Sequence, residues 1–397
     1  MSLTDTPRAN RLHIGIFGKR NSGKSSLINA LTNQDIALVS DIPGTTTDPV
    51  YKTMEIHGIG PCVFIDTAGF DDEGVLGEMR VDKTKAATEK TDIALILLTT
   101  LDIEEELKWI NHFKQINTPV VAIINKSDCL PFIDELIQKI KIQSGLTPLI
   151  VSAKEKKGIQ EVREAMIRLL PEDYEVKSIT GSLAKAGDLI LLVMPQDIQA
   201  PKGRLILPQV QTLRDLLDKK CLVMSCTTDC FEVTLASLVK SPDLIITDSQ
   251  VFKTIYEKKP ASSKLTSFSV LFASYKGDIT TYAKSVHAIE TLTENSKVLI
   301  AEACTHAPLE EDIGREKIPR MLRQKIGSGL TIDIVNGANF PEDLSTYHLV
   351  IQCGACMFNR KYVISRIARA TSQGVPITNY GVVIAYLAGI LDKIDLK

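Results

Sequence analysis

The sequence predicts an α/β protein built from three consecutive domains, the first of which has a parallel sheet. Two observations carry this prediction. Short apolar runs rich in Ile and Val alternate with helical-period segments along the chain, a pattern typical of strands buried between helices. The length of 397 residues also suits two or three domains, at roughly 100 to 200 residues each.

The domains follow from the order of the predicted elements. The first, residues 1–173, has the strands LHIGIF, CVFID, DIALILL, PVVAIIN and TPLIVS, and a linker rich in Pro, Gly, Ser and charges is expected around 169–182. The second, a smaller α/β domain over residues 178–268, has the strands LILLVMP, CLVMSC, LIITD and SFSVLFA. The third, residues 269–397, continues through KVLIAEA, TIDIVNG, HLVIQ and VPITN.

Composition limits the classes of function. Hydrophobic residues make up 44% of the chain, which excludes a largely disordered protein. The net charge of -2 gives no protein-wide attraction to nucleic acid or anionic lipid. The N-terminus lacks a signal-peptide pattern, and the apolar runs are far below the roughly 18 residues of a membrane span. We therefore expect a cytoplasmic protein with no membrane partner, whose eight cysteines are reduced and open to metal or redox roles.

A phosphate-binding loop lies at the start of the first domain. The segment GKRNSGKS, from Gly18 to Ser25, fits G-x-x-x-x-G-K-[ST] and stands between a predicted strand and a predicted helix. Its backbone N–H groups and the helix N-terminus would face the phosphates. Lys24 is predicted to reach the β- and γ-phosphates, and Ser25 to hold Mg²⁺.

Three further motifs follow in order, each at the end of a predicted strand. DTAG supplies Asp66 for the Mg²⁺ shell and Gly69 for the γ-phosphate. NKSD places a carboxylate, Asp128, where it can accept two N–H donors from guanine, so the nucleotide is expected to be GTP. SAK completes the base site. The predicted nucleotide-binding residues are Gly18, Asn21, Ser22, Gly23, Lys24, Ser25, Ser26, Asn125, Lys126, Asp128, Ser152, Ala153 and Lys154.

The segment DIPGTTTDP, Asp41 to Pro49, extends the set. Its PGTT motif makes the first domain similar to the TrmE-Era branch of GTPases. The resemblance implies that Thr46 reaches Mg²⁺ when GTP is bound, so that Lys24, Thr46, Asp66 and Gly69 form the catalytic set. It also puts Asn21 where relatives that need potassium place a ligand of that ion. Phe70 stands where Ras-like proteins have a water-orienting Gln, so slow, regulatory hydrolysis is expected, although Phe70 is equally well read as a core residue.

A second candidate site lies in the third domain. Cys304 follows one predicted strand, and Cys353 and Cys356 follow another in VIQCGAC. Ligand sites form along the carboxyl edge of parallel sheets, so the three thiols are expected to converge. With His306 they supply three sulfurs and an imidazole, a set that suits either structural zinc or an iron-sulfur cluster. The residues alone leave these two choices open, together with plain buried cysteines.

The whole set of motifs resembles the HydF family, GTPases that help mature FeFe-hydrogenase. The family pattern is C-x-H, a gap of some tens of residues and H-C-x-x-C. Cys304, His306, Cys353 and Cys356 match it, whereas Gln352 stands where the pattern has its second histidine. The resemblance implies a dimerisation domain over 178–268 and a 4Fe-4S domain over 269–397.

In such a cluster three cysteines hold three irons, and the fourth iron takes an exchangeable ligand. His306 is the first candidate for that ligand, and Glu310 and Glu311 come next. The resemblance further implies a homodimer that receives a di-iron precursor made with radical-SAM maturases and delivers it to the hydrogenase apoprotein, with GTP as the switch.

Two other functions compete with this interpretation. One is an RNA- or ribosome-associated GTPase with a structural zinc, against which the near-neutral charge and the absence of an RNA-binding module argue. The other is a redox-sensing GTPase that does not transfer its cluster to another protein.

Overall fold

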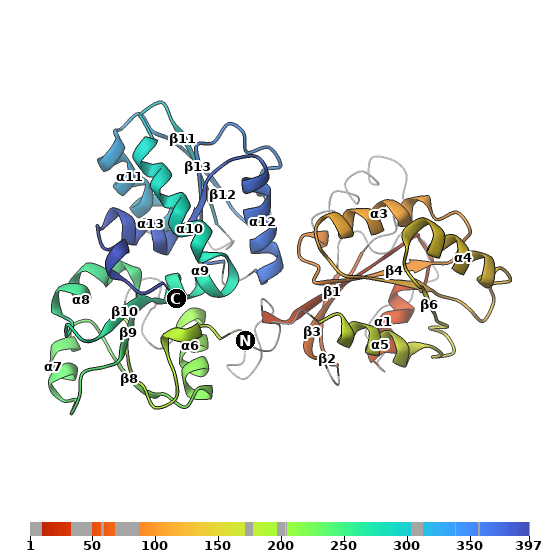
Figure 1. Cartoon of the computed structure of the whole chain (residues 1–397), viewed down its shortest axis with the longest axis horizontal. Coiled ribbons are helices and arrows are strands. Elements are labelled where there is room, and N and C mark those ends of the chain that lie inside the picture. The colour runs from red at the N-terminus through yellow and green to blue at the C-terminus, as the bar shows by residue number, and fades with distance from the viewer. Residues whose placement is uncertain are drawn as a thin grey trace. The chain divides into compact units, whose positions relative to one another are not determined.

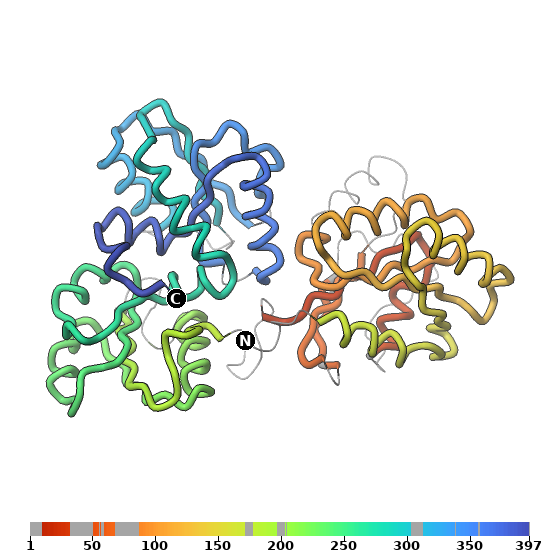
Figure 2. Tube along the Cα trace, viewed as in Figure 1, coloured from red at the N-terminus to blue at the C-terminus, as the bar shows by residue number. Residues whose placement is uncertain are grey.

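The computed structural model describes residues 10–32, 50–56, 59–67, 87–170, 178–196, 203, 205–302, 313–337, 339–355 and 358–396. The chain divides into two compact units, residues 1–174 and residues 175–397, each shown in Figures 1 and 2. None of the helices within the described ranges combines the length and apolar character that crossing a membrane requires.

The first unit contains one sheet of six strands in the order β2-β3-β1-β4-β5-β6. All neighbouring pairs are parallel except β2 and β3. The strands are β1 Leu12–Gly18, β2 Val50–Ile56, β3 Gly60–Asp66, β4 Ile93–Leu98, β5 Val120–Ile124 and β6 Leu149–Ile150, and the helices are α1 Lys24–Thr32, α3 Glu104–Gln115, α4 Ile133–Ser144 and α5 Ile159–Arg168.

Both faces of this sheet are buried. Leu95 and Leu97 of β4 join the core that contains α1 and α5, and Ile96 and Leu98 join the core that contains α3 and α4. Figure 1 shows the two helix pairs on opposite sides of the sheet. A strand buried on both faces reads as an unbroken apolar run, which is why IALILL was predictable as a strand.

Strand β2 of this unit was not predicted from the sequence. It pairs antiparallel with β3, with Val50 opposite Asp66 and Ile56 opposite Gly60. Its sequence, VYKTMEI, mixes polar and apolar residues. Such a mixture suits an edge strand, and it gives a weaker signal than the continuous apolar runs of the central strands.

The second unit contains two parallel sheets of four strands, in the orders β10-β9-β7-β8 and β12-β11-β13-β14. The strands are β7 Leu189–Val193, β8 Leu222–Cys226, β9 Leu244–Thr247, β10 Lys264–Ser267, β11 Lys297–Ala301, β12 Thr331–Val335, β13 Leu349–Gln352 and β14 Ile377–Asn379. The α-helices are α6 Leu207–Asp218, α7 Phe231–Ala236, α8 Phe252–Lys258, α9 Phe268–Lys276, α10 Ile279–Ser285, α11 Ile318–Ile326, α12 Arg360–Ser372 and α13 Tyr380–Leu387. Short helical turns are η2 Gly181–Leu183, η3 Ser249–Val251, η4 Val286–Thr291, the π-turn η5 Ile313–Lys317 and η6 Leu391–Lys393.

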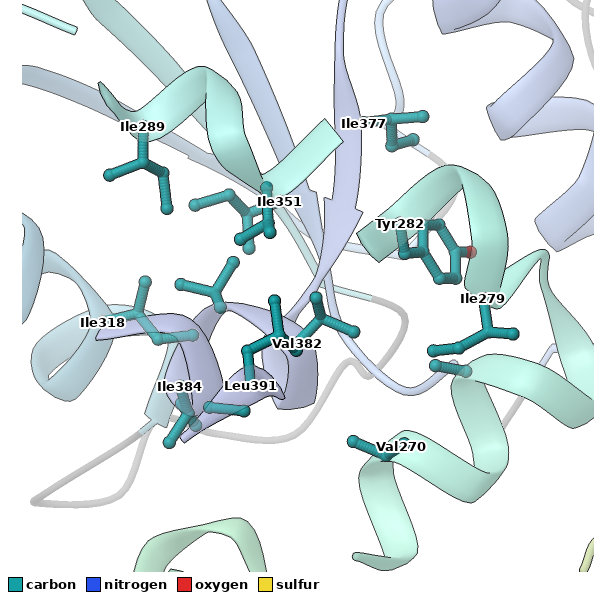
Figure 3. Packing of buried hydrophobic residues seen from close by; sticks show 14 of the residues in the cluster. Val270, Ile279, Tyr282, Ile289, Ile318, Ile351, Ile377, Val382, Ile384 and Leu391 are labelled. Atoms are coloured by element: carbon teal, nitrogen blue, oxygen red, sulfur yellow. The ribbon is translucent and has the colours of Figure 1, made fainter. Parts of the chain in front are cut away.

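Helix α9 is shared by the cores of these two sheets. Phe268 and Phe272 pack in a core with β7 and β9. Val270 and Ala273, on the same helix, pack in a larger core that includes residues of β7, β9, β11 and β13. Figure 3 shows part of this core, with Val270, Ile279, Tyr282 and Ile351 labelled. The two sheets of this unit are therefore joined by continuous apolar packing.

Helix α9 also corrects one prediction. SFSVLFA was expected to be a strand, but only Ser267 of that segment is in β10, and the rest is helical. Ser267 caps the helix, because its side chain accepts a hydrogen bond from the Val270 N–H at 3.2 Å. A short apolar run cannot be assigned to strand or helix by periodicity alone.

Candidate functional site

The phosphate-binding loop connects β1 to α1 in a conformation that depends on glycine. Gly23 has φ +88°, and a Cβ atom there would lie 2.3 Å from Asn125 Nδ2. Asn21 also has a left-handed φ, of 58°, a region that Asn tolerates better than most residues. The loop ends where the Leu27 N–H donates to Gly23 O at 2.9 Å, which starts the first turn of α1.

Two predicted phosphate and metal residues hold this loop. Lys24 Nζ donates to the carbonyl oxygens of Gly18 and Lys19, both at 3.0 Å, and so lies across the loop. Ser25 Oγ donates to Asp66 Oδ2 at 3.0 Å. The structure therefore brings together Lys24, Ser25 and Asp66, which the sequence separates by about forty residues. It brings them together because β1 and β3 are neighbours, with Ile16 opposite Asp66.

The Asp66 carboxyl is buried and has a raised pKa. The carboxyl is 5% exposed, and burial raises its pKa, while the Ser25 hydrogen bond and the charge of Lys24 act in the opposite direction. A buried carboxylate with one hydroxyl partner is incompletely compensated. A divalent cation beside Ser25 would supply the missing positive charge.

The base-side loops meet at Asn125. Its Nδ2 donates to Ser22 O at 2.8 Å, and its Oδ1 accepts from the Ala153 N–H at 3.1 Å. One side chain thus ties the phosphate-binding loop to the loop after β6. The neighbouring Ser152 hydroxyl donates to Asp128 Oδ1 at 2.7 Å, and that bond is the main reason why the pKa of the exposed Asp128 is lowered.

The remaining predicted nucleotide residues lie around these contacts. Ser26 is in the first turn of α1. Lys126 directly follows Asn125 and has φ 61°, and the Lys154 side chain is exposed. Thr46, Gly69, Phe70 and the rest of the Asp41–Pro49 segment lie outside the described residues.

Lys19 lies in the phosphate-binding loop and was not among the binding residues predicted from the sequence. Its Nζ donates to the backbone oxygen of Asp102 at 2.6 Å and to the Asp102 carboxylate at 2.8 Å. The hydrogen bond from Lys19 lowers the pKa of Asp102. Because Lys19 precedes the predicted ligand Asn21, this pair attaches the phosphate-binding loop to the loop before α3. No local motif signals such a contact between distant segments.

The thiolate region lies at the carboxyl edge of the last sheet. β11 and β13 are parallel neighbours, with Ala301 opposite Gln352, and the Cys353 N–H donates to Ala301 O at 3.1 Å. The Ala355 N–H points at Cys353 Sγ, at 3.4 Å. Cys353 therefore lies beside the end of the strand that leads toward Cys304.

Gln352, the residue that precedes Cys353, is buried. It is 1% exposed, and its Nε2 donates to the Tyr282 hydroxyl. Burial raises the pKa of Tyr282, so the phenol is neutral. Oε1 of Gln352 has no hydrogen-bond partner in the part of the chain that the structure describes. His348 lies at the other end of β13, where its ring accepts from the Lys297 N–H at 3.1 Å.

The other predicted cluster ligands, Cys304, His306, Glu310, Glu311 and Cys356, lie outside the described residues. Among the residues that are described, no three or more His, Cys, Asp or Glu side chains gather in a way that would hold a metal ion. Of the three predicted thiolates, the described residues therefore include only Cys353, together with the ends of β11 and β13.

Comparison with known proteins first defines the class. Residues 13–126 match the family model described as 50S ribosome-binding GTPase. The tRNA modification GTPase MnmE of Heliobacterium modesticaldum is 37% identical over 164 residues, which are 40% of this chain and 34% of the relative. GTPase Der of Wolinella succinogenes is 32% identical over 186 residues, 44% of this chain and 39% of the relative. The chain therefore has a P-loop GTPase domain, and its match covers only about a third of the length of these relatives.

Among solved structures, Era in complex with MgGDPNP and part of 16S ribosomal RNA has a TM-score of 0.37 and 20% identity, covering 54% of this chain and 93% of that one. Era of Aquifex aeolicus bound to GDP·AlF4⁻ has a TM-score of 0.36 and 20% identity, covering 54% of this chain and 92% of that one.

The rest of the chain gives the family. Residues 179–277 match the hydrogen maturase F dimerization domain, and residues 280–395 match the hydrogen maturase F tetramerization domain. Together these two matches cover more than half of the chain, and with the GTPase match the order is GTPase, dimerization, tetramerization. The chain belongs to the hydrogen maturase F family, which confirms the family that the sequence motifs indicated.

Proposed function

We propose that this GTPase is a scaffold and carrier for the di-iron unit of FeFe-hydrogenase, and that it holds a 4Fe-4S cluster through Cys304, Cys353 and Cys356. The observation that supports this proposal is the pairing of β11 with β13, because it puts Cys353 beside the strand end that precedes Cys304. A thiolate whose sulfur faces a backbone N–H fits an iron-sulfur cluster, since hydrogen bonds to the sulfurs tune such clusters.

The fourth iron would take an exchangeable ligand, His306 first and Glu310 or Glu311 next. Gln352 is committed to Tyr282 through its amide nitrogen, and an amide oxygen is a poor iron ligand. A replaceable corner suits a carrier that accepts another iron unit and then releases it. In this proposal residues 178–268 form the dimer and residues 269–397 hold the cluster, in the cytoplasm, where the cysteines are reduced.

GTP would act as the switch. Mg²⁺ would be held by Ser25 and, in the GTP-bound state, by Thr46, and Asp66 would complete its shell. Ordering of the Asp41–Pro49 segment by GTP would change contacts with the radical-SAM maturases and the hydrogenase apoprotein. Hydrolysis would be slow, with a potassium ion near Asn21 in place of an arginine finger.

Metal analysis of anaerobically purified protein tests the proposal. We expect about four irons and four sulfides per chain, a cubane signal in electron paramagnetic resonance of the reduced protein, and loss of that signal in Cys304→Ala. Bound zinc without a cubane signal would refute the cluster and would favour a GTPase with a structural metal site. Loaded protein that leaves an inactive hydrogenase apoprotein inactive would refute delivery and favour redox sensing.

A further inference from the structure

Two buried cations contact the turn between Ala355 and Phe358, which follows Cys353 and is called the cysteine turn below. Lys276, the last residue of α9, is 2% exposed. Its Nζ donates to Phe358 O at 2.8 Å and to Ala355 O at 3.2 Å. These carbonyls lie on either side of residues 356–357, so one ammonium group links the two ends of the turn.

The second cation is Arg366, in the middle of α12. It is also 2% exposed, and its guanidinium carbon lies 5.1 Å from the Phe358 ring and 4.8 Å from the Tyr362 ring. Nη2 donates to Gly337 O at 2.6 Å. Within the described ranges no carboxylate pairs with Arg366, and its Nε has no hydrogen-bond partner.

A buried guanidinium without an anion is costly, because Arg cannot lose its proton and its charge is removed from water. Contacts with aromatic faces offset only part of that cost. An anionic group near the turn would offset the rest. Asp278, the Cys353 thiol and Arg366 all influence the Tyr282 hydroxyl electrostatically, Asp278 more than the other two, so Arg366 shares its neighbourhood with the sulfur and with one carboxylate.

We propose that Lys276 and Arg366 are positioning residues for the cysteine turn, and that their charges stabilise the anionic cluster and raise its reduction potential. Three thiolates make the cluster site negative, and reduction adds one more negative charge. A nearby buried positive charge therefore favours the reduced state. Ala355 in this turn has a left-handed φ of 50°, a conformation that Ala adopts at a cost.

The inference rests on the proposed cluster, and its test separates the two. Lys276→Met and Arg366→Met remove the charge but keep an unbranched apolar stem, and Lys276→Arg keeps the charge. Arg369→Met is the matched control. Arg369 lies about one helical turn further along α12, and it also donates to backbone oxygens, those of Phe340 and Pro341.

The measurement is a redox titration of the full-length protein, followed by electron paramagnetic resonance, with iron content and thermal unfolding recorded for each variant. We expect each Met variant to shift the reduction equilibrium about tenfold toward the oxidised cluster, roughly 59 mV for one electron. Lys276→Arg and Arg369→Met should stay near wild type.

A wild-type protein without a cluster would defeat the proposed function. A wild-type cluster whose potential and iron content are unchanged in both Met variants would defeat only this inference. If a Met variant fails to fold, Lys276→Gln, which keeps a hydrogen-bond donor without the charge, decides the question. An unchanged potential in that variant would also overturn the inference.

Discussion

Replacing Asn125 with Ala is the sharpest test of how the nucleotide site is held. The Asn125 side chain is 1% exposed and makes two hydrogen bonds, to Ser22 O at 2.8 Å and from the Ala153 N–H at 3.1 Å. Each buried partner left unsatisfied costs about 1–3 kcal/mol. Relaxation of the loops and access of water offset part of this cost, so we expect the variant to lose about 2–4 kcal/mol of unfolding free energy in the first unit.

Urea unfolding of the full chain can report on that unit alone. Trp109 is the only tryptophan in the sequence, and it lies on α3 with its ring stacked 6.0 Å from that of Phe17 of β1. Its fluorescence therefore follows the first unit. GTP affinity should fall at least tenfold, about 1.4 kcal/mol, because the phosphate-binding loop and the base loop lose their shared support.

Two variants serve as controls for this prediction. Gln160→Ala removes an amide from the surface of α5, where its hydrogen bond with Glu164 is exposed, and should change stability by less than about 0.5 kcal/mol. Asn125→Asp keeps the acceptor for the Ala153 N–H but loses the donor to Ser22 O, so it tests the bond to Ser22 together with the cost of a buried charge. If Asn125→Ala unfolds at the same urea concentration as Gln160→Ala, the bridging role of this side chain is wrong.

Three further outcomes follow from the structure. Ser25→Ala, which loses the hydroxyl 3.0 Å from Asp66, should abolish the Mg²⁺-dependent gain in GTP affinity, as measured by titration with and without Mg²⁺; a retained gain would exclude Ser25 as a ligand. Burial raises the pKa of Asp66, so the metal-free protein should gain stability as the pH falls through that pKa, whereas Mg²⁺ affinity should weaken over the same range. Urea unfolding with Asp66→Asn as control checks the first effect, and a pH-independent Mg²⁺ affinity would contradict the second. Leu222 is 60% exposed on edge strand β8, and Leu222→Asp should convert oligomers to smaller species in sedimentation velocity. The control Ile142→Asp, at a residue 81% exposed on α4, should leave the oligomers unchanged. Equal sedimentation of both variants would exclude β8 from the interface.

The arrangement of the predicted nucleotide motifs was largely predictable because their signals are local and because topology brings them together. Each motif follows a buried strand, and parallel strands end at one edge of the sheet. The order of motifs from Gly18 to Lys154 therefore implied a common site before any coordinates. The two bonds of Asn125 were not predictable, since they join segments separated by 103 and 28 residues.

The second half of the chain shows where sequence patterns stop being informative. Its strands were recognisable, but SFSVLFA is short and mostly buried in a core shared by two sheets, and no period distinguishes it from a buried strand. The burial of Lys276 and Arg366 was not predicted, because in sequence a buried cation in a helix cannot be distinguished from a solvent-exposed Lys or Arg. Their importance follows from contacts with Ala355, Phe358 and Gly337, which only the fold defines.

Helix α9 connects the two proposed roles of the second unit. Its apolar residues pack against both sheets, and its last residue, Lys276, holds the cysteine turn. Close-packed interiors resist small displacements. If the Leu222→Asp test places β8 in the interface, a change in that interface would reach the cysteine turn through the β7–β10 sheet and α9, without passing through the GTPase domain. Oligomer state and cluster potential should therefore vary together, and the Leu222→Asp variant allows both to be measured in one protein.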